Sequence, residues 1–380
     1  MGDLLSAMSK ALLKAHAKRD DWASIVLSNW SPSLVGQSQD EIFAAELTDE
    51  NSQDSVARYF GFRSRNEMGQ AGMKSLDSEF EVAVDAVTSG NASALKAMLQ
   101  ANPELPKVRS HWGHRSTLLH YIAVNGVEIH RQIVPANAVE VARLLLEAGA
   151  EPDALAETYG GGMNQTTLSL LITSGHPHEA GLVEPLIEVL AEFGSNLNGL
   201  DESGAPLKMA LDFGYTRTAQ TLVKLGALIL SVECAAGVGN LVELNRWLKK
   251  DPSQKQLDES LYFSARNGHV DCVQPLIDSG ADVDSRGWFG GPALHWAAVN
   301  GFDAIVKRLI DAGSDPNIRD SRFKAHAAGW ANEGGHASIR DWLLDHGCKE
   351  SIVEAAAFGR IERVEEFLND DPGLVNTNEG

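Results

Sequence analysis

A glycine recurs along most of this chain at a nearly constant spacing, each time after a short alanine-rich or apolar stretch of helical pattern. The nine glycines of the series are Gly90, Gly126, Gly175, Gly214, Gly239, Gly268, Gly301, Gly335 and Gly359. Eight intervals separate Gly90 from Gly359 over 269 residues, so the mean interval is about 34 residues. Such a period predicts a stack of small supersecondary units, because one unit cannot bury its own apolar face.

The clearest copy of the unit, residues 290–317, resembles an ankyrin repeat. The segment from Pro292 to His295 stands where that repeat has its T-P-L-H element, and Gly301 and Gly313 follow the two helices. Glycine ends a helix well because it adopts the left-handed conformation without strain. The period is also close to the 33 residues of ankyrin repeats. The resemblance implies an all-α fold: a solenoid of about nine helix–turn–helix units with short β-hairpin fingers, preceded by a helical N-terminal cap.

Three segments are expected along the chain. Residues 1–78 lack the repeat signature and have helical patterning, which predicts a helical cap over the first repeat. Residues 79–230 form a first ankyrin block with insertions, and residues 231–380 form a second block. The boundary lies near residue 231 because short units without a finger begin near residues 80, 231 and 351. We expect residues 374–380 to be extended or disordered.

Four further stretches, 114–128, 135–154, 159–162 and 176–181, resemble an uncharacterised family of bacterial ankyrin-repeat proteins. No enzymatic activity comes with that resemblance. A common phrase of the family is T-P-L-G-W-A, for which this chain has the segment from His326 to Ala331. Because the Thr-Pro start is lost there, we expect the first helix of this repeat to begin late or to fray.

The charge of the chain disfavours nucleic acid as a partner. There are 32 basic and 52 acidic side chains, for a formal net charge of −20, and such a chain repels phosphate backbones. No apolar run approaches the length of a membrane span. The three cysteines lie far apart without a C-x-x-C motif, which fits a reducing compartment. We therefore expect a cytoplasmic protein that binds neither nucleic acid nor membrane.

No motif of an enzyme is present, whether a nucleophile elbow, a phosphate-binding loop or a kinase signature. The sequence therefore predicts no enzyme and no cofactor. His120 and His295 occupy the His of the T-P-L-H element, where the family uses the ring to bond neighbouring backbone. His176 and His178 lie beside Glu179, but no third zinc ligand is identifiable, so we predict no metal site. The glycines at 160–162 indicate a flexible finger tip.

The resemblance places the usual contact positions of an ankyrin array on this chain. The predicted partner-binding residues are Trp112, His114, Arg115, Met163, Glu202, Phe213, Arg266, Trp288, Phe289, Asn300, Arg322 and Phe323. Val299 and Glu333 occupy equivalent positions. Adjacent Trp288 and Phe289 at a hairpin tip are of the kind that forms binding hot spots, although Trp288 could instead pack on the neighbouring finger.

The predicted function is that of a scaffold or adaptor that binds another protein through the concave finger face. Arginines among the finger aromatics favour a partner that offers apolar side chains and a few carboxylates. The alternative is a ligand- or metal-responsive regulatory protein that uses the insertions at 127–135 and 176–181, with His130, His176 and His178. Those insertions are equally compatible with tolerated surface loops. An enzyme without a familiar motif is the third hypothesis.

Overall fold

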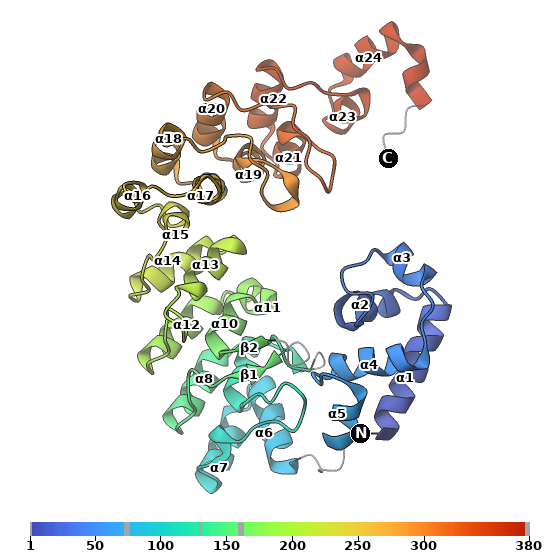
Figure 1. The fold of residues 1–380 in the computed structure, drawn as a ribbon, viewed down its shortest axis with the longest axis vertical. Coiled ribbons are helices and arrows are strands. Elements are labelled where there is room, and N and C mark those ends of the chain that lie inside the picture. Colours follow the sequence, from blue (N-terminus) through green and yellow to red (C-terminus); the bar gives the residue numbers. More distant parts are fainter. Residues whose placement is uncertain (1, 72–76, 129–130, 159–162, 377–380) are drawn as a thin grey trace. The chain divides into compact units, whose positions relative to one another are not determined.

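The computed structural model of this chain describes residues 2–71, 77–128, 131–158 and 163–376. The chain forms two compact halves, and both are mostly helical (Figure 1). The N-terminal half comprises Met1–Met209 and Thr221–Ala227, and the C-terminal half comprises Ala210–Gln220 and Leu228–Gly380. Each half has its own packing and is described by itself.

Five helices precede the repeats in the N-terminal half: α1 (Gly2–Ala17), α2 (Asp21–Trp30), α3 (Gln39–Ala44), α4 (Asp49–Tyr59) and α5 (Arg65–Ala71). Three of them begin at a side chain that accepts a backbone N–H of the first turn, namely Asp20, Ser38 and Thr48. These helices share a hydrophobic core of their own, which also includes Trp112 from the repeat array. Helices α1–α5 therefore pack on one another and on the loop that carries Trp112, within the same compact half of the chain.

The remainder of the N-terminal half contains α6 (Ser78–Thr88), α7 (Ala92–Ala101), η1 (Leu105–Lys107), η2 (Leu118–Ala123), α8 (Ala138–Glu147), α10 (Thr167–Ile172), α11 (Gly175–Glu179) and α12 (Val183–Glu192). His120 thus lies in a 3₁₀ helix. A finger is formed by β1 (Ala156–Glu157) and β2 (Met163–Gln165), which pair in antiparallel fashion. Its expected flexible tip at 160–162 lies outside the described residues.

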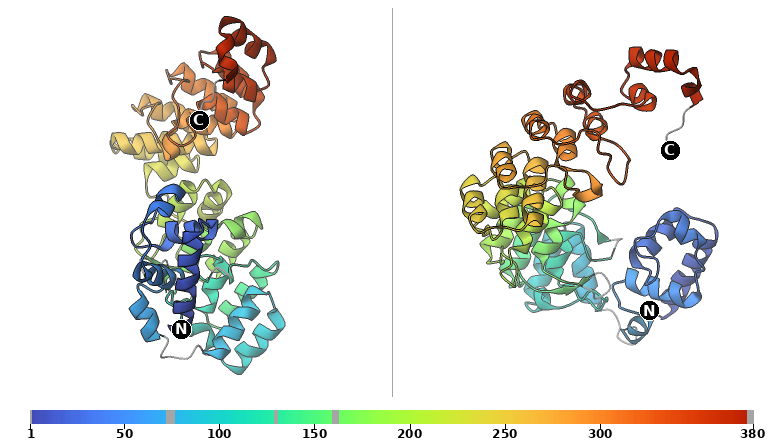
Figure 2. Two further views of the ribbon diagram at one scale, coloured as in Figure 1. Left: turned by 90° about the vertical axis from the view of Figure 1, so that its right-hand side faces the viewer. Right: turned by 45° about the horizontal axis from the view of Figure 1, so that its top comes forward.

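Helices α13 (Ala205–Asp212) and α14 (Thr216–Lys224) each contribute residues to both halves. The remaining elements are α15 (Val232–Gly237), α16 (Leu241–Leu248), α17 (Gln254–Asn267), α18 (Val270–Asp278), η4 (Trp288–Gly290), α19 (Ala293–Val299), α20 (Asp303–Asp311), α21 (Ala327–Glu333), α22 (Ala337–Asp345), α23 (Ile352–Ala357), α24 (Ile361–Asp370) and η5 (Pro372–Asn376). In Figure 1 the pairs α17–α18, α19–α20 and α21–α22 follow one another in a row, and Figure 2 shows the same yellow-to-orange part of the ribbon from two other sides.

One continuous core runs through the C-terminal half. Its inner helices contribute small residues such as Ala265, Ala298 and Ala331, all fully buried. Its outer helices contribute larger ones such as Leu276 and Leu309. Short side chains let neighbouring inner helices approach closely, so that each repeat covers the apolar face of the next.

Two expectations about local structure are wrong. Helix α21 begins at Ala327 without delay, because the ring of His326 accepts the N–H of Gly329 at 3.2 Å and replaces the missing threonine as N-cap. Residues 374–376 are part of the 3₁₀ helix η5 and are not extended, while residues 377–380 lie outside the described residues.

The expected role of the two repeat histidines is confirmed. His120 Nε2 lies 2.9 Å from the carbonyl oxygen of Ala154, and His295 Nε2 lies 3.2 Å from that of Ala325. Each ring donates to the backbone that leads into the next repeat. Burial lowers the pKa of both imidazoles to about 4, so both are neutral at pH 7.

Candidate protein-binding groove

Consecutive fingers of the C-terminal half each carry an aromatic side chain toward the inner helices. Phe289 lies in η4, and Phe323 lies in the loop between α20 and α21. Together with Trp296 of α19 and Trp330 of α21 they line a groove of about 450 Å³. Its wall is completed by Val299, Ala325, Gly329 and Glu333. We call this feature the aromatic groove.

The rings of the aromatic groove contact one another directly. Phe289 is stacked on Trp296 with ring centroids 6.2 Å apart, and Trp296 meets Trp330 edge to face at 5.1 Å. Phe323 lies 6.0 Å from Phe289 and 6.2 Å from Trp330. Aromatic pairs at such separations attract each other beyond their buried area. Because Trp330 is 8% exposed and Phe323 is 59% exposed, the groove has a buried floor and an open wall.

A single carboxylate positions this wall. Asp320 is 1% exposed and accepts the backbone N–H groups of Arg322, Phe323 and Ala325 as well as Nε1–H of Trp330. Burial by itself raises the pKa of the Asp320 carboxyl, but the hydrogen bonds outweigh it and hold the pKa below its usual value. The ionised carboxylate therefore holds the finger and the groove floor in one arrangement.

Two guanidinium groups lie over the rings. Arg322 stands 4.9 Å from the Phe289 centroid and 5.4 Å from that of Phe323, while Arg266 stands 4.4 Å from that of Trp296. Arg266 also donates to the carbonyl oxygen of Asp212 at 2.7 Å. No carboxylate within the described parts of the chain forms an ion pair with Arg322. The groove therefore presents apolar surface beside a positive charge.

The structure brings together four of the predicted partner-binding residues, Arg266, Phe289, Arg322 and Phe323. Asn300 lies at the end of α19, where its amide donates to the carbonyl oxygen of Trp296 at 2.9 Å. Phe213 is stacked on Tyr215 and is 42% exposed. Trp288 lies in η4, but its side chain is outside the described part of the structure, so its role stays a prediction.

Two of the predicted contact residues of the N-terminal half are buried. Trp112 is 7% exposed and stacks on Phe60 of the N-terminal helices at 5.3 Å, and His114 is 2% exposed. The expectation that these two side chains offer an exposed contact is corrected, because Phe60 stacks on Trp112 while Tyr121 and Glu128 lie against His114. Arg115 remains exposed.

Two further predicted residues of that half lie on other loops and strands. Glu202 accepts the side-chain amide of Asn196 at 2.7 Å. Met163 begins β2, and its side chain lies outside the described part.

Sequence reasoning missed the groove floor. Trp296 and Trp330 each stand five residues before a closing glycine, Gly301 and Gly335, and so occupy the same position in consecutive repeats. Two tryptophans at the same position of consecutive repeats predict that their rings lie next to each other. This signal was overlooked because the contact positions were sought only at finger tips and just before the closing glycines.

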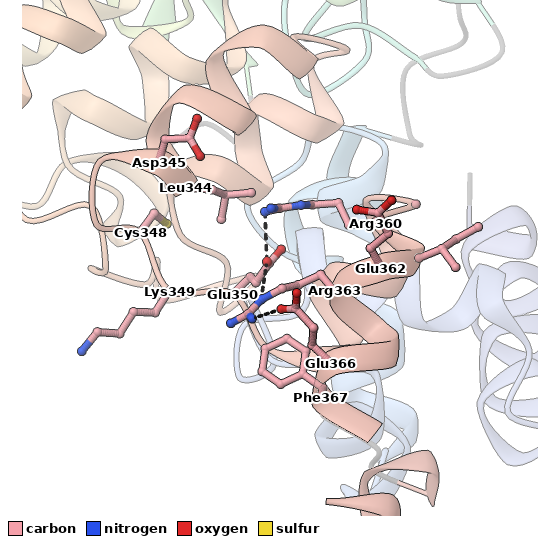
Figure 3. A pocket seen from close by; sticks show the side chains of 12 residues that line it. Leu344, Asp345, Cys348, Lys349, Glu350, Arg360, Glu362, Arg363, Glu366 and Phe367 are labelled. Carbon is pink, nitrogen blue, oxygen red and sulfur yellow. Dashed lines mark hydrogen bonds and ion pairs between the residues drawn. The ribbon is translucent and has the colours of Figure 1, made fainter. Parts of the chain in front are cut away.

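A second cleft in the C-terminal half, of about 800 Å³, lies between α22 and α24 (Figure 3). The carboxylate of Glu350, 5% exposed, receives Arg360 at 2.9 Å and Arg363 at 3.3 Å. Arg363 also pairs with Glu366. Two cations and two carboxylates thus neutralise one another and fasten the last short repeat, so we take the aromatic groove as the candidate site.

Comparison with known proteins supports the repeat assignment. A family model described as ankyrin repeats, in three copies, matches residues 232–320, which include Phe289 and Trp296. The chain is also 28% identical over 218 residues to the probable E3 ubiquitin-protein ligase XBOS32 of Oryza sativa subsp. japonica. That match covers 53% of this chain and 38% of the rice protein. The resemblance to a bacterial family stays a prediction.

Two searches of the described residues bear on other kinds of site. Among them, no three histidine, cysteine, aspartate or glutamate side chains are grouped so that they can hold a metal ion. No helix of the described chain has both the length and the apolar character needed to cross a bilayer. Residues 232–320 thus contain ankyrin repeats, and the aromatic groove lies partly on these repeats and partly on the segment that follows them.

Proposed function

We propose that this chain is a scaffold or adaptor that binds another protein through the aromatic groove. Ankyrin repeats generally mediate protein–protein interaction, and the observation that supports this groove is its exposed ring beside an unpaired guanidinium. Phe323 is 59% exposed over the buried Trp330, and Arg322 lies against it. Aromatic and arginine side chains dominate the energy of protein interfaces. The fitting partner offers apolar side chains to the rings and carboxylates to Arg322.

The test replaces two exposed side chains beside the groove, Arg322 and Phe323, and leaves Trp296 and Trp330 unchanged. Arg322→Ala with Phe323→Ala should abolish capture of the partner while the melting temperature stays nearly unchanged, because both side chains are exposed. A matched control is Val242→Ala with Arg246→Ala on the outer helix α16, where Val242 is 78% exposed. Affinity capture followed by mass spectrometry should show proteins retained by the control and lost by the groove variant. Equal yields from both variants would place the binding face elsewhere.

The ligand-responsive alternative is favoured by one observation on the first insertion. Glu128 and Gln132 from this insertion line a partly open pocket of about 230 Å³. The second insertion instead forms α11, where Pro177 is buried and the His178 ring donates to the carbonyl oxygen of Ile172 at 3.1 Å. His130 lies outside the described residues. We therefore restrict this alternative to the first insertion and to small organic ligands.

A further inference from the structure

We propose that the aromatic groove holds a short proline-rich segment of its partner in the polyproline II conformation, oriented by opposite charges at its two ends. This inference rests on the proposed function and adds the chemistry of the bound segment. An acidic residue of the segment lies toward Arg322, and a basic residue lies toward Glu333. The groove is accessible, since Phe323 in its wall is 59% exposed, and its volume of about 450 Å³ suits a short segment.

The floor of the groove offers ring faces and not hydrogen-bond donors. Phe289, Trp296, Trp330 and Phe323 form a closed circuit of contacts, with neighbouring ring centroids 5.1–6.2 Å apart. Nε1–H of Trp330 donates to Asp320 at 3.1 Å, and Nε1 of Trp296 is buried. A bound segment therefore gains from packing on aromatic surface and not from hydrogen bonds to the floor.

The finger beside the groove is poorly suited to pair with an added β-strand. Its carboxylate Asp320 accepts the N–H groups of Arg322, Phe323 and Ala325. The N–H of Ser321 donates to a carbonyl oxygen of the preceding finger at 2.8 Å. Strand addition depends on main-chain hydrogen bonds to an exposed edge, and these four N–H groups are already bonded within the chain. The bound segment must therefore do without main-chain donors from this finger.

A polyproline II segment meets both conditions. Its backbone makes no internal hydrogen bonds and stays solvated, and proline has no N–H to satisfy. Such segments bind aromatic-lined grooves, and they lose little conformational entropy because their shape is preformed. An amphipathic helix is the competing occupant, because its N–H groups are bonded internally. Its apolar anchors extend over about two turns, or about 10 Å, whereas the four rings here form one tight cluster.

Two charged side chains beside the rings give the groove a direction. Arg322 stands 4.9 Å from the Phe289 centroid and 5.4 Å from that of Phe323, on the finger side. Glu333 lines the groove as the last residue of α21 and is exposed. Neither side chain forms an ion pair with another residue that the structure describes. Complementary charges at the two ends of a segment fix its register and direction.

The first test selects binders from a library of random short peptides displayed on phage, with the purified full chain as target. Groove binders are those lost on the Arg322→Ala, Phe323→Ala double variant and kept by the Val242→Ala, Arg246→Ala control. We expect them to be enriched in P-x-x-P patterns between an acidic and a basic residue. Groove binders without proline, or with apolar residues at helical spacing, would overturn this inference and leave the proposed function standing. A selection without any groove binder would also overturn it, while affinity capture tests the proposed function separately.

The second test uses fluorescence anisotropy of one selected peptide. Exchanging its two prolines for alanine should weaken binding about tenfold, as for the loss of an interface anchor. Glu333→Lys should weaken binding of the peptide about two- to fivefold and tighten binding of a version with glutamate in place of its basic residue. Lysine is favourable at the C-terminus of α21, so this variant should fold.

Asp311→Lys is the matched control for the charge reversal. Asp311 is likewise exposed and is the last residue of its helix, α20, but it does not line the groove. This control should leave the charge preference of the peptide unchanged. An unchanged preference in Glu333→Lys as well would overturn the assigned direction, and full affinity of the alanine peptide would overturn the polyproline II assignment.

Discussion

The finger at Trp112 and the fingers at Phe289 and Phe323 present the same kind of side chain in opposite surroundings. Trp112 is 7% exposed because Phe60 of the N-terminal helices stacks on it, whereas Phe323 is 59% exposed. The difference shows that the chain itself covers one finger ring and leaves the other open to a partner protein. The Phe60–Trp112 contact also shows the kind of ring stacking that a partner of the aromatic groove would supply.

The largest loss of stability is expected from Trp112→Ala. Trp112 belongs to the hydrophobic core of the N-terminal helices, so its removal should lower the free energy of unfolding by about 3–5 kcal/mol. Phe323→Ala, at an exposed site, should cost less than about 0.5 kcal/mol. Urea denaturation of both variants measures the two costs. Equal costs would show that the two fingers do not differ in burial.

Acid should destabilise both halves through their repeat histidines. His120 and His295 have pKa values lowered to about 4, so a penalty in the free energy of unfolding appears as pH falls below 6.5 and grows until pH 4. Urea denaturation between pH 4 and 7 should show this acid loss in the wild type and a smaller one in His120→Gln and in His295→Gln. An acid loss of unchanged size in both variants would contradict the role of these histidines.

Gly113 tests how closely the N-terminal helices pack on the loop that carries Trp112. A Cβ at Gly113 would lie 2.1 Å from backbone atoms of Gly61, so Gly113→Ala should displace the N-terminal helices and cost about 1–3 kcal/mol. Faster hydrogen exchange in α4 would report that displacement. Protection of α4 equal to that of the wild type would show that the cover does not rest on this contact.

A small change in stability is expected from a glycine in the groove. A Cβ at Gly329 in α21 meets Ala325 Cβ at 3.2 Å, so the gain in helix propensity is opposed by a tight contact, and Gly329→Ala should change the free energy of unfolding by less than about 1 kcal/mol. The added methyl group narrows the aromatic groove, and we expect weaker partner capture at a nearly unchanged melting temperature. Undiminished capture would argue that the partner does not reach the groove floor.

Local chemistry was readable from the residues. The bonds of His120 and His295 to the next repeat follow from their place in the T-P-L-H element, and residues 232–320 match ankyrin repeats as the period indicates. His326 was misjudged because an imidazole as N-cap was not considered, although its Nδ1 accepts a backbone N–H as a threonine hydroxyl does. The placement of the boundary near residue 231 stays a prediction.

The linear pattern was thus sufficient for the ankyrin repeats of residues 232–320, because spacing along the chain sets which residues share the inner face of stacked repeats. It was insufficient for exposure. Whether Trp112 faces solvent depends on Phe60, which lies 52 residues earlier in the chain, and the pairing of His114 with Glu128 depends on how an insertion folds back. Burial is a property of the surfaces that meet in three dimensions, so only the tertiary structure separated the covered finger from the open aromatic groove.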